Sequence, residues 1–276
     1  MADHLVTAEV PERLDQALVR HGLARSRGQA RDLIAAGAVE LAGRPARKPA
    51  LPVEPGQQIR VTGDDRQWVS RAARKLIGAL EAFPEVDPKG ARCLDLGACT
   101  GGFTQVLLAH GAAQVIALDV GHDQLAAELV ADPRVEDRSG TTARGLTADD
   151  LDGPVDIVVG DLSFISLRLV LDSVAAVLAS GGEALLLVKP QFEVGRARLP
   201  KSGVVTAPKD HRRALLGVLE RAADVGLEVQ GLARSPLRGG EGNTEYLVRL
   251  TRAVGGGLPW QAQVEAVDQL IERTPS

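Results

Sequence analysis

Aromatic residues are scarce in this chain, and it contains no long apolar run. Phe, Trp and Tyr make up 3% of the 276 residues, so a packed core must consist mainly of Ala, Val and Leu. No stretch approaches the roughly 18 apolar residues of a membrane span. The N-terminus shows no basic region followed by an apolar one, as a signal peptide would. We therefore expect a soluble, cytoplasmic protein that does not enter a membrane.

Cysteine is also rare. Cys93 and Cys99 are the two cysteines of the chain, which is too few for a disulfide framework or a zinc site made of four cysteines. The carboxylates lie on separate predicted elements and no histidine cluster accompanies them, so we expect no metal. Both thiols are expected to be reduced, as in a cytosol.

Charge is divided unevenly along the chain. Residues 1–63 hold nine Lys and Arg against seven Asp and Glu, while the remainder holds 23 against 29. A small basic domain joined to a larger acidic domain is typical of a protein in which a nucleic-acid-binding domain is attached to a catalytic domain. We place a small domain at 1–63, a linker at 64–69 and a catalytic domain at 70–276. Chance variation in surface charge is the alternative.

A glycine-rich turn follows the apolar run that ends in Asp95 and Leu96. Gly97, Gly101 and Gly102 have the spacing G-x-x-x-G-G. This is neither the G-x-G-x-x-G of dinucleotide enzymes nor a phosphate-binding G-x-x-x-x-G-K-[ST], and the mismatch argues against a dehydrogenase. Because glycines let a ligand approach the main chain, we expect a binding site at this turn.

The next predicted strand ends in Asp119, about twenty positions after the turn. A carboxylate there can accept hydrogen bonds from two ribose hydroxyls. A ribose site without a phosphate site favours an adenosine ligand with an uncharged linkage, and S-adenosylmethionine is the commonest. A nucleotide-type fold that holds another ligand is the alternative.

Strands and helices alternate through the larger part of the chain, which predicts an α/β fold with a mostly parallel sheet of seven strands. Two late strands, separated by a glycine-rich turn, are expected to form an antiparallel edge pair. Residues 195–208 show no periodicity and are expected to be a mobile loop over the site. The expected strands are 92–96, 114–119, 135–137, 155–160, 184–188, 228–235 and 245–250. The expected helices are 70–83, those beginning near 103, 124 and 167, and 209–225 and 259–271.

Residues 1–63 predict two helices, at 12–21 and 26–36, with short strands at 38–41 and 58–61. Ser26 and Gln29 have the spacing of a capping box that begins the second helix. Basic residues surround this helix and the following turn, and on one face they would meet phosphates. They are Arg25, Arg27, Arg31, Arg44, Arg47 and Lys48. The pattern resembles the small RNA-binding domain first known in a ribosomal protein, the alpha-L RNA-binding motif. A helix pair that binds nothing is the alternative.

Three charged residues lie at the ends of buried apolar runs. Asp161 ends the fourth predicted strand, Lys189 ends the fifth, and Glu245 begins a late strand. Ligands bind beyond the carboxyl ends of parallel strands, so these side chains are candidates for a site. A lysine at the end of a buried run is costly unless carboxylates accompany it. Three solvated rim charges are the alternative.

With Lys75, these residues reproduce the Lys-Asp-Lys-Glu order of FtsJ-like ribose 2′-O-methyltransferases. Five segments resemble the TlyA family, in the same order along nearly the whole chain. They are Trp68–Leu76, Leu94–Thr104, Asp161–Ser166, Lys189–Glu193 and Gly242–Tyr246. The chain differs in having Arg74 where His is expected, and it also differs at 138–144.

The resemblance implies a Rossmann-like methyltransferase that uses S-adenosylmethionine to methylate cytidine 2′-hydroxyls of 16S or 23S rRNA, as in mycobacterial members linked to capreomycin sensitivity. Lys189 would be the base, with the electrostatic stabilisation of an alkoxide as its alternative role. Lys75 and Glu245 would position the ribose and the base, and Asp161 would orient Lys189. The expected donor-binding residues are Asp95, Gly97, Gly101, Gly102, Asp119 and Thr142. The expected partner is ribosomal RNA. The protein is expected to be a monomer.

Two rival functions belong to other classes. The first is an RNA-binding protein that senses a cofactor without chemistry, which would need neither Lys75 nor Lys189. The second is a membrane-active hemolysin, a name historically given to members of this family. No basic amphipathic segment stands out in the sequence to favour it.

Overall fold

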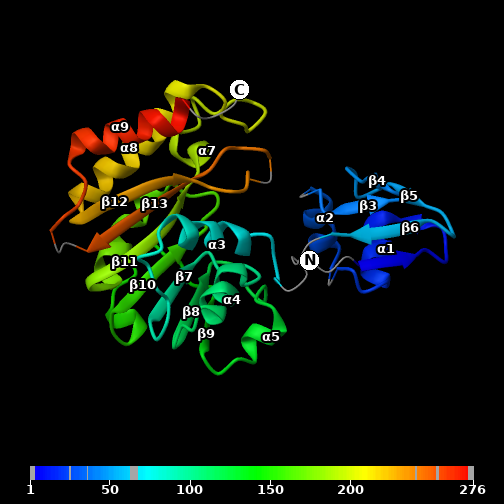
Figure 1. The fold of residues 1–276 in the computed structure, drawn as a ribbon. Coiled ribbons are helices and arrows are strands. Elements are labelled where there is room, and N and C mark those ends of the chain that lie inside the picture. The colour runs from blue at the N-terminus through cyan, green and yellow to red at the C-terminus, as the bar shows by residue number, and fades with distance from the viewer. Residues whose placement is uncertain are drawn as a thin grey trace. The chain divides into compact units, whose positions relative to one another are not determined.

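The computed structural model describes residues 4–24, 26–35, 37–62, 68–239, 241–252 and 255–272. Contacts divide the chain into two compact units, Met1–Ala73 and Arg74–Ser276 (Figure 1). Of the predicted linker at 64–69, only Trp68 and Val69 lie within the described residues. The proposed boundaries of the linker therefore stay a prediction.

The smaller unit contains an antiparallel sheet in the order β1-β6-β3-β4, a two-stranded β2-β5 pair and two helices. Its core is mostly Leu, Ala, Val and Ile. The elements are β1 (His4–Thr7), β2 (Glu12–Arg13), α1 (Leu14–Arg20), α2 (Arg27–Ala35), β3 (Val39–Leu41), β4 (Arg44–Pro45), β5 (Pro52–Val53) and β6 (Gln58–Val61). The strands β1, β2, β4 and β5 were not predicted from the sequence.

Both predicted helices of this unit are present, with changed starting points. The first begins at Leu14 because Glu12 and Arg13 pair with β5 instead. At the second helix, the Ser26 hydroxyl accepts a hydrogen bond from the main-chain nitrogen of Gln29 at 3.2 Å. This bond satisfies one of the free amides at the helix start, as the capping pattern predicts.

A buried carboxylate connects the two helices. Asp15 is fully buried and accepts hydrogen bonds from Arg13 at 2.9 Å and from Arg27 at 2.9 Å. The hydrogen bond from Arg13 is the main reason why the pKa of Asp15 falls to about 2. The guanidinium group of Arg27, expected to bind RNA, is therefore already engaged by this unit's own core.

The larger unit is built on a seven-stranded sheet in the order β12-β13-β11-β10-β7-β8-β9. Neighbouring strands from β11 through β9 run parallel, and β13 is antiparallel to both β11 and β12. The sequence prediction of a mostly parallel sheet with a late antiparallel pair is confirmed. The strands are β7 (Arg92–Leu96), β8 (Gln114–Asp119), β9 (Val135–Ser139), β10 (Val155–Gly160), β11 (Leu178–Val188), β12 (Leu227–Arg234) and β13 (Tyr246–Arg252).

Helices cover both faces of this sheet (Figure 1). The core on one face joins strand residues to apolar side chains of α6, α8 and α9, and Figure 1 shows α3 and α4 on the other face. The helices are α3 (Ala73–Ala82), α4 (Gly102–Ala109), α5 (Ala127–Val130), α6 (Leu171–Val177), α7 (Pro190–Glu193), α8 (Pro208–Asp224) and α9 (Trp260–Glu272). The helix predicted near 124 is the single turn α5, and the one predicted near 167 is preceded by a 3-10 turn.

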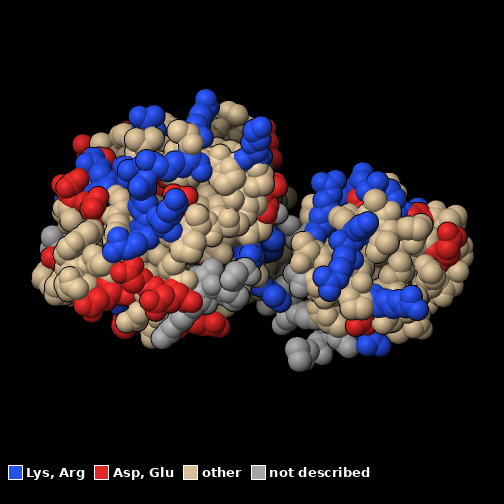
Figure 2. All heavy atoms as spheres, turned by 90° about the horizontal axis from the view of Figure 1, so that it is seen from above, with Lys and Arg blue, Asp and Glu red and all other residues tan. Residues whose placement is uncertain are grey.

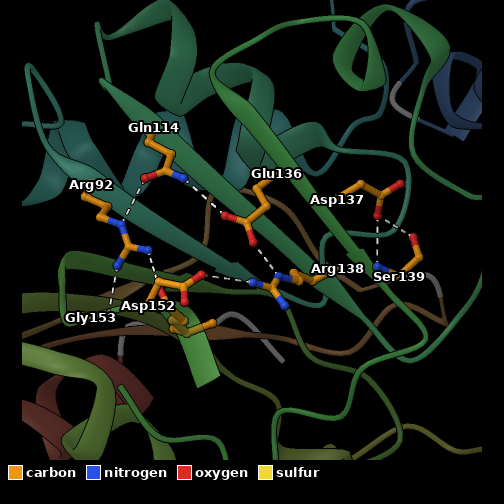
Figure 3. A network of polar contacts seen from close by, with 9 residues as sticks. Arg92, Gln114, Glu136, Asp137, Arg138, Ser139, Asp152 and Gly153 are labelled. Atoms are coloured by element: carbon orange, nitrogen blue, oxygen red, sulfur yellow. Dashed lines mark hydrogen bonds and ion pairs between the residues drawn. The ribbon is translucent and has the colours of Figure 1, made fainter. Parts of the chain in front are cut away.

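A polar side-chain network links β7, β8 and β9 (Figure 3). Arg92 donates to Gln114 at 2.9 Å, and Gln114 donates to Glu136 at 3.1 Å. Glu136 pairs in turn with Arg138, while Arg92 also donates to the Gly153 carbonyl at 2.9 Å. Arg92 and Gln114 are the first residues of their strands, so this part of the network lies away from the strands' carboxyl ends. It links the amino ends of the strands that carry Asp95 and Asp119.

Candidate active site

The glycine-rich turn lies directly against the residues that follow β10. Gly97 has a φ of +80°, and a Cβ added there would lie 3.3 Å from the main-chain oxygen of Asp161. The amide of Asp161 donates to the carbonyl of Leu96 at 3.2 Å. Gly101, with a φ of +92°, precedes the first residue of α4, Gly102. The predicted donor turn and the predicted catalytic aspartate are therefore neighbours.

Asp95 is buried just before this turn. One of its oxygens, Oδ2, accepts hydrogen bonds from Thr104 through the main-chain nitrogen at 2.9 Å and the hydroxyl at 2.7 Å. The other oxygen, Oδ1, has no hydrogen-bond partner within the described residues. Burial is the main cause that raises the pKa of Asp95 to about 7. A buried acceptor of this kind is stabilised when a cationic or N–H group meets it, directly or through water.

Asp119 ends β8 and faces the same turn. Its Oδ2 accepts from the Cys99 amide at 2.9 Å, and its Oδ1 accepts from the Gly121 amide at 2.8 Å. These two bonds fix the orientation of the carboxylate and leave each oxygen a further lone pair. Thr142 lies beyond β9, where it lines a cavity of about 320 Å³ together with Leu118.

Four charged side chains from distant parts of the sequence meet beside this turn. Lys75 comes from α3, Asp161 follows β10, Lys189 follows β11 and Glu245 precedes β13. Lys75 Nζ is 3.0 Å from Asp161 Oδ2 and 2.7 Å from Glu245 Oε2. Lys189 Nζ is 2.6 Å from Asp161 Oδ1. We call these four residues the charge cluster; its charges alternate in sign along the contacts.

The charge cluster is largely shielded from water. The exposed side-chain fractions are 6% for Lys75, 7% for Lys189, 14% for Asp161 and 2% for Glu245. Burial alone would lower the pKa of Lys75, but Asp161 and Glu245 outweigh it and hold that pKa above its usual value. Burial alone would raise the pKa of Asp161, whereas Lys75 and Lys189 hold it below its usual value. Mutual pairing therefore keeps Lys75 and Asp161 charged.

Residues that were not singled out as site residues from the sequence contact Lys189. Its Nζ donates to the Ser163 hydroxyl at 2.8 Å and lies 5.9 Å from the centre of the Phe192 ring. Phe164 follows Ser163, has a φ of +64° and is 93% exposed. A left-handed conformation is costly for a bulky residue, so the loop after Asp161 is strained beside the site. The Asp-Leu-Ser-Phe motif was the sequence signal for these contacts.

One further buried carboxylate, that of Glu193, and one buried amide, that of Asn243, hold the loops near the charge cluster through hydrogen bonds. Glu193, at the end of α7, accepts from the Leu167 amide at 2.6 Å and from the Ser166 hydroxyl at 2.6 Å. Asn243 accepts from the Val205 amide at 2.9 Å and donates to the Gly203 carbonyl at 2.9 Å. The second half of the predicted mobile loop is thus bound to the segment that leads to Glu245.

A buried histidine, His211, also links this loop to β13. His211 contacts the Val205 carbonyl through Nε2 at 2.9 Å and the Tyr246 hydroxyl through Nδ1 at 3.0 Å. A carbonyl accepts only, so Nε2 carries the proton and Nδ1 accepts from the tyrosine. Burial is the main cause that lowers the pKa of His211.

The basic residues predicted to bind RNA belong to the smaller unit. Arg31, Arg44, Arg47 and Lys48 are exposed. Arg25 lies outside the described residues, and Arg27 is held by Asp15 as described above. The exposed four are available to a partner, and their contact with RNA stays a prediction.

The described ranges hold neither a cluster of metal ligands nor a membrane-crossing helix. They contain no group of His, Cys, Asp and Glu side chains that could hold a metal ion. None of their helices combines the length and apolar character that a bilayer crossing requires.

Comparison with known families matches both units. Residues 68–252 match the model of the FtsJ-like methyltransferases, and residues 12–59 match the S4 domain. The fold and the site thus define a methyltransferase of the FtsJ-like class that carries an S4 domain.

Individual relatives identify the particular family within this class. The 16S/23S rRNA (cytidine-2′-O)-methyltransferase TlyA of Mycobacterium tuberculosis is 48% identical over 95% of this chain and 98% of its own. Hemolysin A of Brachyspira hyodysenteriae is 34% identical over 85% and 98%, respectively. A solved structure from Streptococcus thermophilus, of a protein that carries the name hemolysin, aligns with a TM-score of 0.74 and 35% identity over 96% and 97%. The chain belongs to the TlyA family.

Proposed function

We propose that the protein transfers a methyl group from S-adenosylmethionine to the ribose 2′-hydroxyl of cytidines in 16S or 23S rRNA. The observation that carries this proposal is the meeting of Lys75, Asp161, Lys189 and Glu245 beside the glycine-rich turn. The 48% identity to an rRNA (cytidine-2′-O)-methyltransferase, over 95% of the chain, supports the substrate class. The link to capreomycin sensitivity stays an expectation from the family resemblance.

The residues around the turn fit the proposed donor. Asp95 Oδ1 is a buried acceptor without a hydrogen-bond partner in the described structure, which suits the donor's amino group, directly or through water. Gly97, Gly101 and Gly102 would offer bare main chain to the methionine end, and Asp119 would accept from the ribose hydroxyls. Gly101 also serves packing, because a Cβ added there would lie 2.2 Å from Leu129 Cδ1. Thr142 would lie near the adenine. The bound donor supplies an electrophilic methyl group on a sulfonium, whose positive charge the nearby carboxylates tolerate.

Proton removal makes a ribose hydroxyl nucleophilic. A base must come within about 3 Å of that hydroxyl, and the reacting groups must be held in line. We assign the base to Lys189 Nζ, which Asp161 and Ser163 hold at 2.6 and 2.8 Å. To act as the base, this amine must be in its neutral form, so that it can accept the proton of the 2′-hydroxyl. Asp161 orients this amine, and the Lys75–Glu245 pair positions the ribose and the base. The alternative is that a charged Lys189 stabilises the forming alkoxide.

The two units would divide the work. A domain at 1–63 would grip RNA phosphates through its exposed basic residues, and a domain at 70–276 would carry out the transfer, with a linker at 64–69 between them. Since its substrate would be ribosomal RNA, the protein would act in the cytoplasm. We further expect it to act as a monomer and without a metal.

Buried charges argue against a pure binding role. A protein that only senses a cofactor gains nothing from enclosing two lysines and two carboxylates, because removing charges from water is costly. The direct test incubates the purified protein with methyl-labelled S-adenosylmethionine and either deproteinised rRNA or ribosomal subunits. Label should enter the RNA in at least one of these substrates. If no label enters any of them while the donor binds, the proposed function is wrong.

A further inference from the structure

A dense group of positive charges follows the charge cluster in the larger unit. Residues 195–213 contain six Lys and Arg and a single Asp, although residues 64–276 as a whole are acidic. All six basic side chains are exposed. We call them the basic surface; it consists of Arg196, Arg198, Lys201, Lys209, Arg212 and Arg213. Figure 2, which views the larger unit from the side of α8 and α9, shows Lys and Arg gathered on that face.

The basic surface contributes little to the stability of the fold. In the described part of the chain, Arg212 is the one member with a recorded carboxylate partner, Asp268 at 2.7 Å. Lys209 lies in the first turn of α8, where the positive end of the helix dipole disfavours a cation, and Arg212 and Arg213 lie in the second turn. Six exposed cations, only one of which has a carboxylate partner in the described structure, are better explained by binding to an anion.

The loop that carries Arg196, Arg198 and Lys201 is held at both ends by segments close in sequence to members of the charge cluster. It begins after α7, whose first residue follows Lys189, and Glu193 at the end of α7 binds the Leu167 amide at 2.6 Å. At its other end, the Val205 amide donates to Asn243 at 2.9 Å, two residues before Glu245. The basic side chains thus lie on this loop and on the start of α8 that follows it, beside the proposed ribose site.

We infer that the basic surface binds RNA phosphates beside the target nucleotide, as a second RNA contact carried by the catalytic unit itself. This inference rests on the proposed function. Every ribose in an RNA chain is flanked by two phosphates, so an RNA whose 2′-hydroxyl reaches Lys189 brings its backbone to the rim of the site. The contacts position the strand and read no bases, as phosphate contacts generally do.

Salt dependence tests the inference, because each phosphate contact releases counterions. The variant Arg196→Gln/Arg198→Gln is compared with the wild type for binding to 23S rRNA and to a short RNA duplex, by filter retention over a series of salt concentrations. Losing two contacts should reduce the slope of log K against log[salt] by about 1.4–1.8. The affinity for S-adenosylmethionine should not change, since neither residue belongs to the donor site.

A charge-matched control and a second variant make the result specific. Lys89→Gln/Arg134→Gln removes two exposed positive charges at the amino ends of β7 and β9, of which Arg134 is paired with Asp132 at 2.7 Å, and should leave the slope unchanged. Lys201→Gln/Lys209→Gln should reproduce the smaller slope, in case the first variant folds poorly. An unchanged slope in both test variants would overturn the inference.

Two further outcomes separate the alternatives. If the variants lose sedimentation with phosphatidylserine vesicles while their RNA slope matches the wild type, the surface binds membranes and the inference is wrong. The binding assay does not depend on methyl transfer. It therefore distinguishes a failure of the proposed activity from a failure of the inferred RNA contact. If the wild type methylates no RNA yet the slopes fall as expected, the surface stands as an RNA contact and the proposed activity does not.

Discussion

Asp95 shows how a single buried carboxyl can serve a ligand. Its pKa of about 7 lies above the usual value because burial disfavours the charged form. A carboxyl whose folded pKa is raised costs stability progressively as pH rises from about 4 to about 7, since the unfolded chain ionises more easily. A positively charged ligand group at Oδ1 would offset this cost.

The affinity for S-adenosylmethionine should therefore depend on the ionisation of Asp95. We expect binding to tighten as pH rises from about 6 to about 7.5, as the carboxylate that faces the donor's ammonium forms. Isothermal titration across this range measures the effect. Asp95→Asn should bind more weakly and lose this rise. An identical pH dependence in the variant would contradict the assignment.

Lys75 is the member of the charge cluster that forms ion pairs with two carboxylates, Asp161 and Glu245. Lys75→Met would leave Asp161 with one partner and Glu245 with none of the cluster's cations. Removing one partner from a buried ion pair typically costs about 3–5 kcal/mol of unfolding free energy. Urea denaturation should show a loss of this size together with loss of activity.

The double variant Lys75→Met/Glu245→Gln is the matched control. It removes the uncompensated carboxylate and keeps the Asp161–Lys189 pair, so part of the lost stability should return while activity does not. A single variant as stable as the wild type would show that the pairing of Lys75 is energetically unimportant.

Residue identities at the site were largely predictable, and the contacts between them were not. Asp161, Lys189 and Glu245 each sit at the end of an apolar run, which is visible in the sequence. The hydrogen bond from Lys189 to Ser163 depends on the strained loop after Asp161, which no sequence period encodes. Likewise, only the tertiary neighbour Asp15 shows that Arg27 is engaged within the fold.

At the scale of elements, the glycine-rich turn couples the donor site to the charge cluster. Gly97→Ala would add a Cβ 3.3 Å from the Asp161 carbonyl oxygen, at a position with a φ of +80°. The main chain beside Asp161 would have to move. A displacement of 1 Å can cost about 100-fold in rate, so we expect turnover to fall roughly tenfold or more, with weaker donor binding.

Gly90→Ala controls for backbone strain alone. Gly90 has a φ of +73° and no atom within 4 Å of an added Cβ, and it lies at the other edge of the sheet, before β7. Both variants should lose about 1–2 kcal/mol of unfolding free energy from the left-handed conformation. Equal kinetic effects in the two variants would argue against the proposed coupling.

Elements with strong periodicity were found from the sequence, and short ones were missed. The predicted strands 92–96, 114–119 and 155–160 match β7, β8 and β10 in their bounds. The strands β1, β2, β4 and β5 contain two to four residues each. Pairing with distant segments forms β1, β2 and β5, whereas β4 pairs with the neighbouring β3 across a short turn. The helix α7 is a single turn and was also missed.

At the scale of the whole molecule, the proposal assigns RNA affinity to both units and chemistry to one. Arg44→Gln/Arg47→Gln/Lys48→Gln neutralises three exposed charges of the smaller unit. If all three meet phosphates, the salt slope for rRNA binding should fall by about 2–3, with unchanged affinity for S-adenosylmethionine. Filter retention and donor titration measure the two quantities.

Arg20→Gln/Arg60→Gln is the control within the same unit. These arginines have carboxylate partners, Glu12 at 3.1 Å and Glu40 at 3.9 Å, and should contribute less to RNA binding. A slope that falls equally in both variants would indicate a diffuse effect of net charge rather than contacts made by one face.

The two-unit division could be anticipated from charge and motifs, because the basic module and the acidic body differ in composition. The position of the basic surface beside the charge cluster could not be anticipated from the sequence. Its residues lie within positions 196–213, but only the attachment of Val205 to Asn243 shows that this stretch lies near Glu245.

The most direct measurement of the central claim is the nucleoside content of rRNA methylated by the wild type and by Lys189→Ala. Wild-type protein should produce 2′-O-methylcytidine, detected by mass spectrometry after nuclease digestion. Lys189→Ala should produce none while binding S-adenosylmethionine as tightly as the wild type. Full methylation by this variant, or a wild-type product methylated on the base instead of the ribose, would contradict the account.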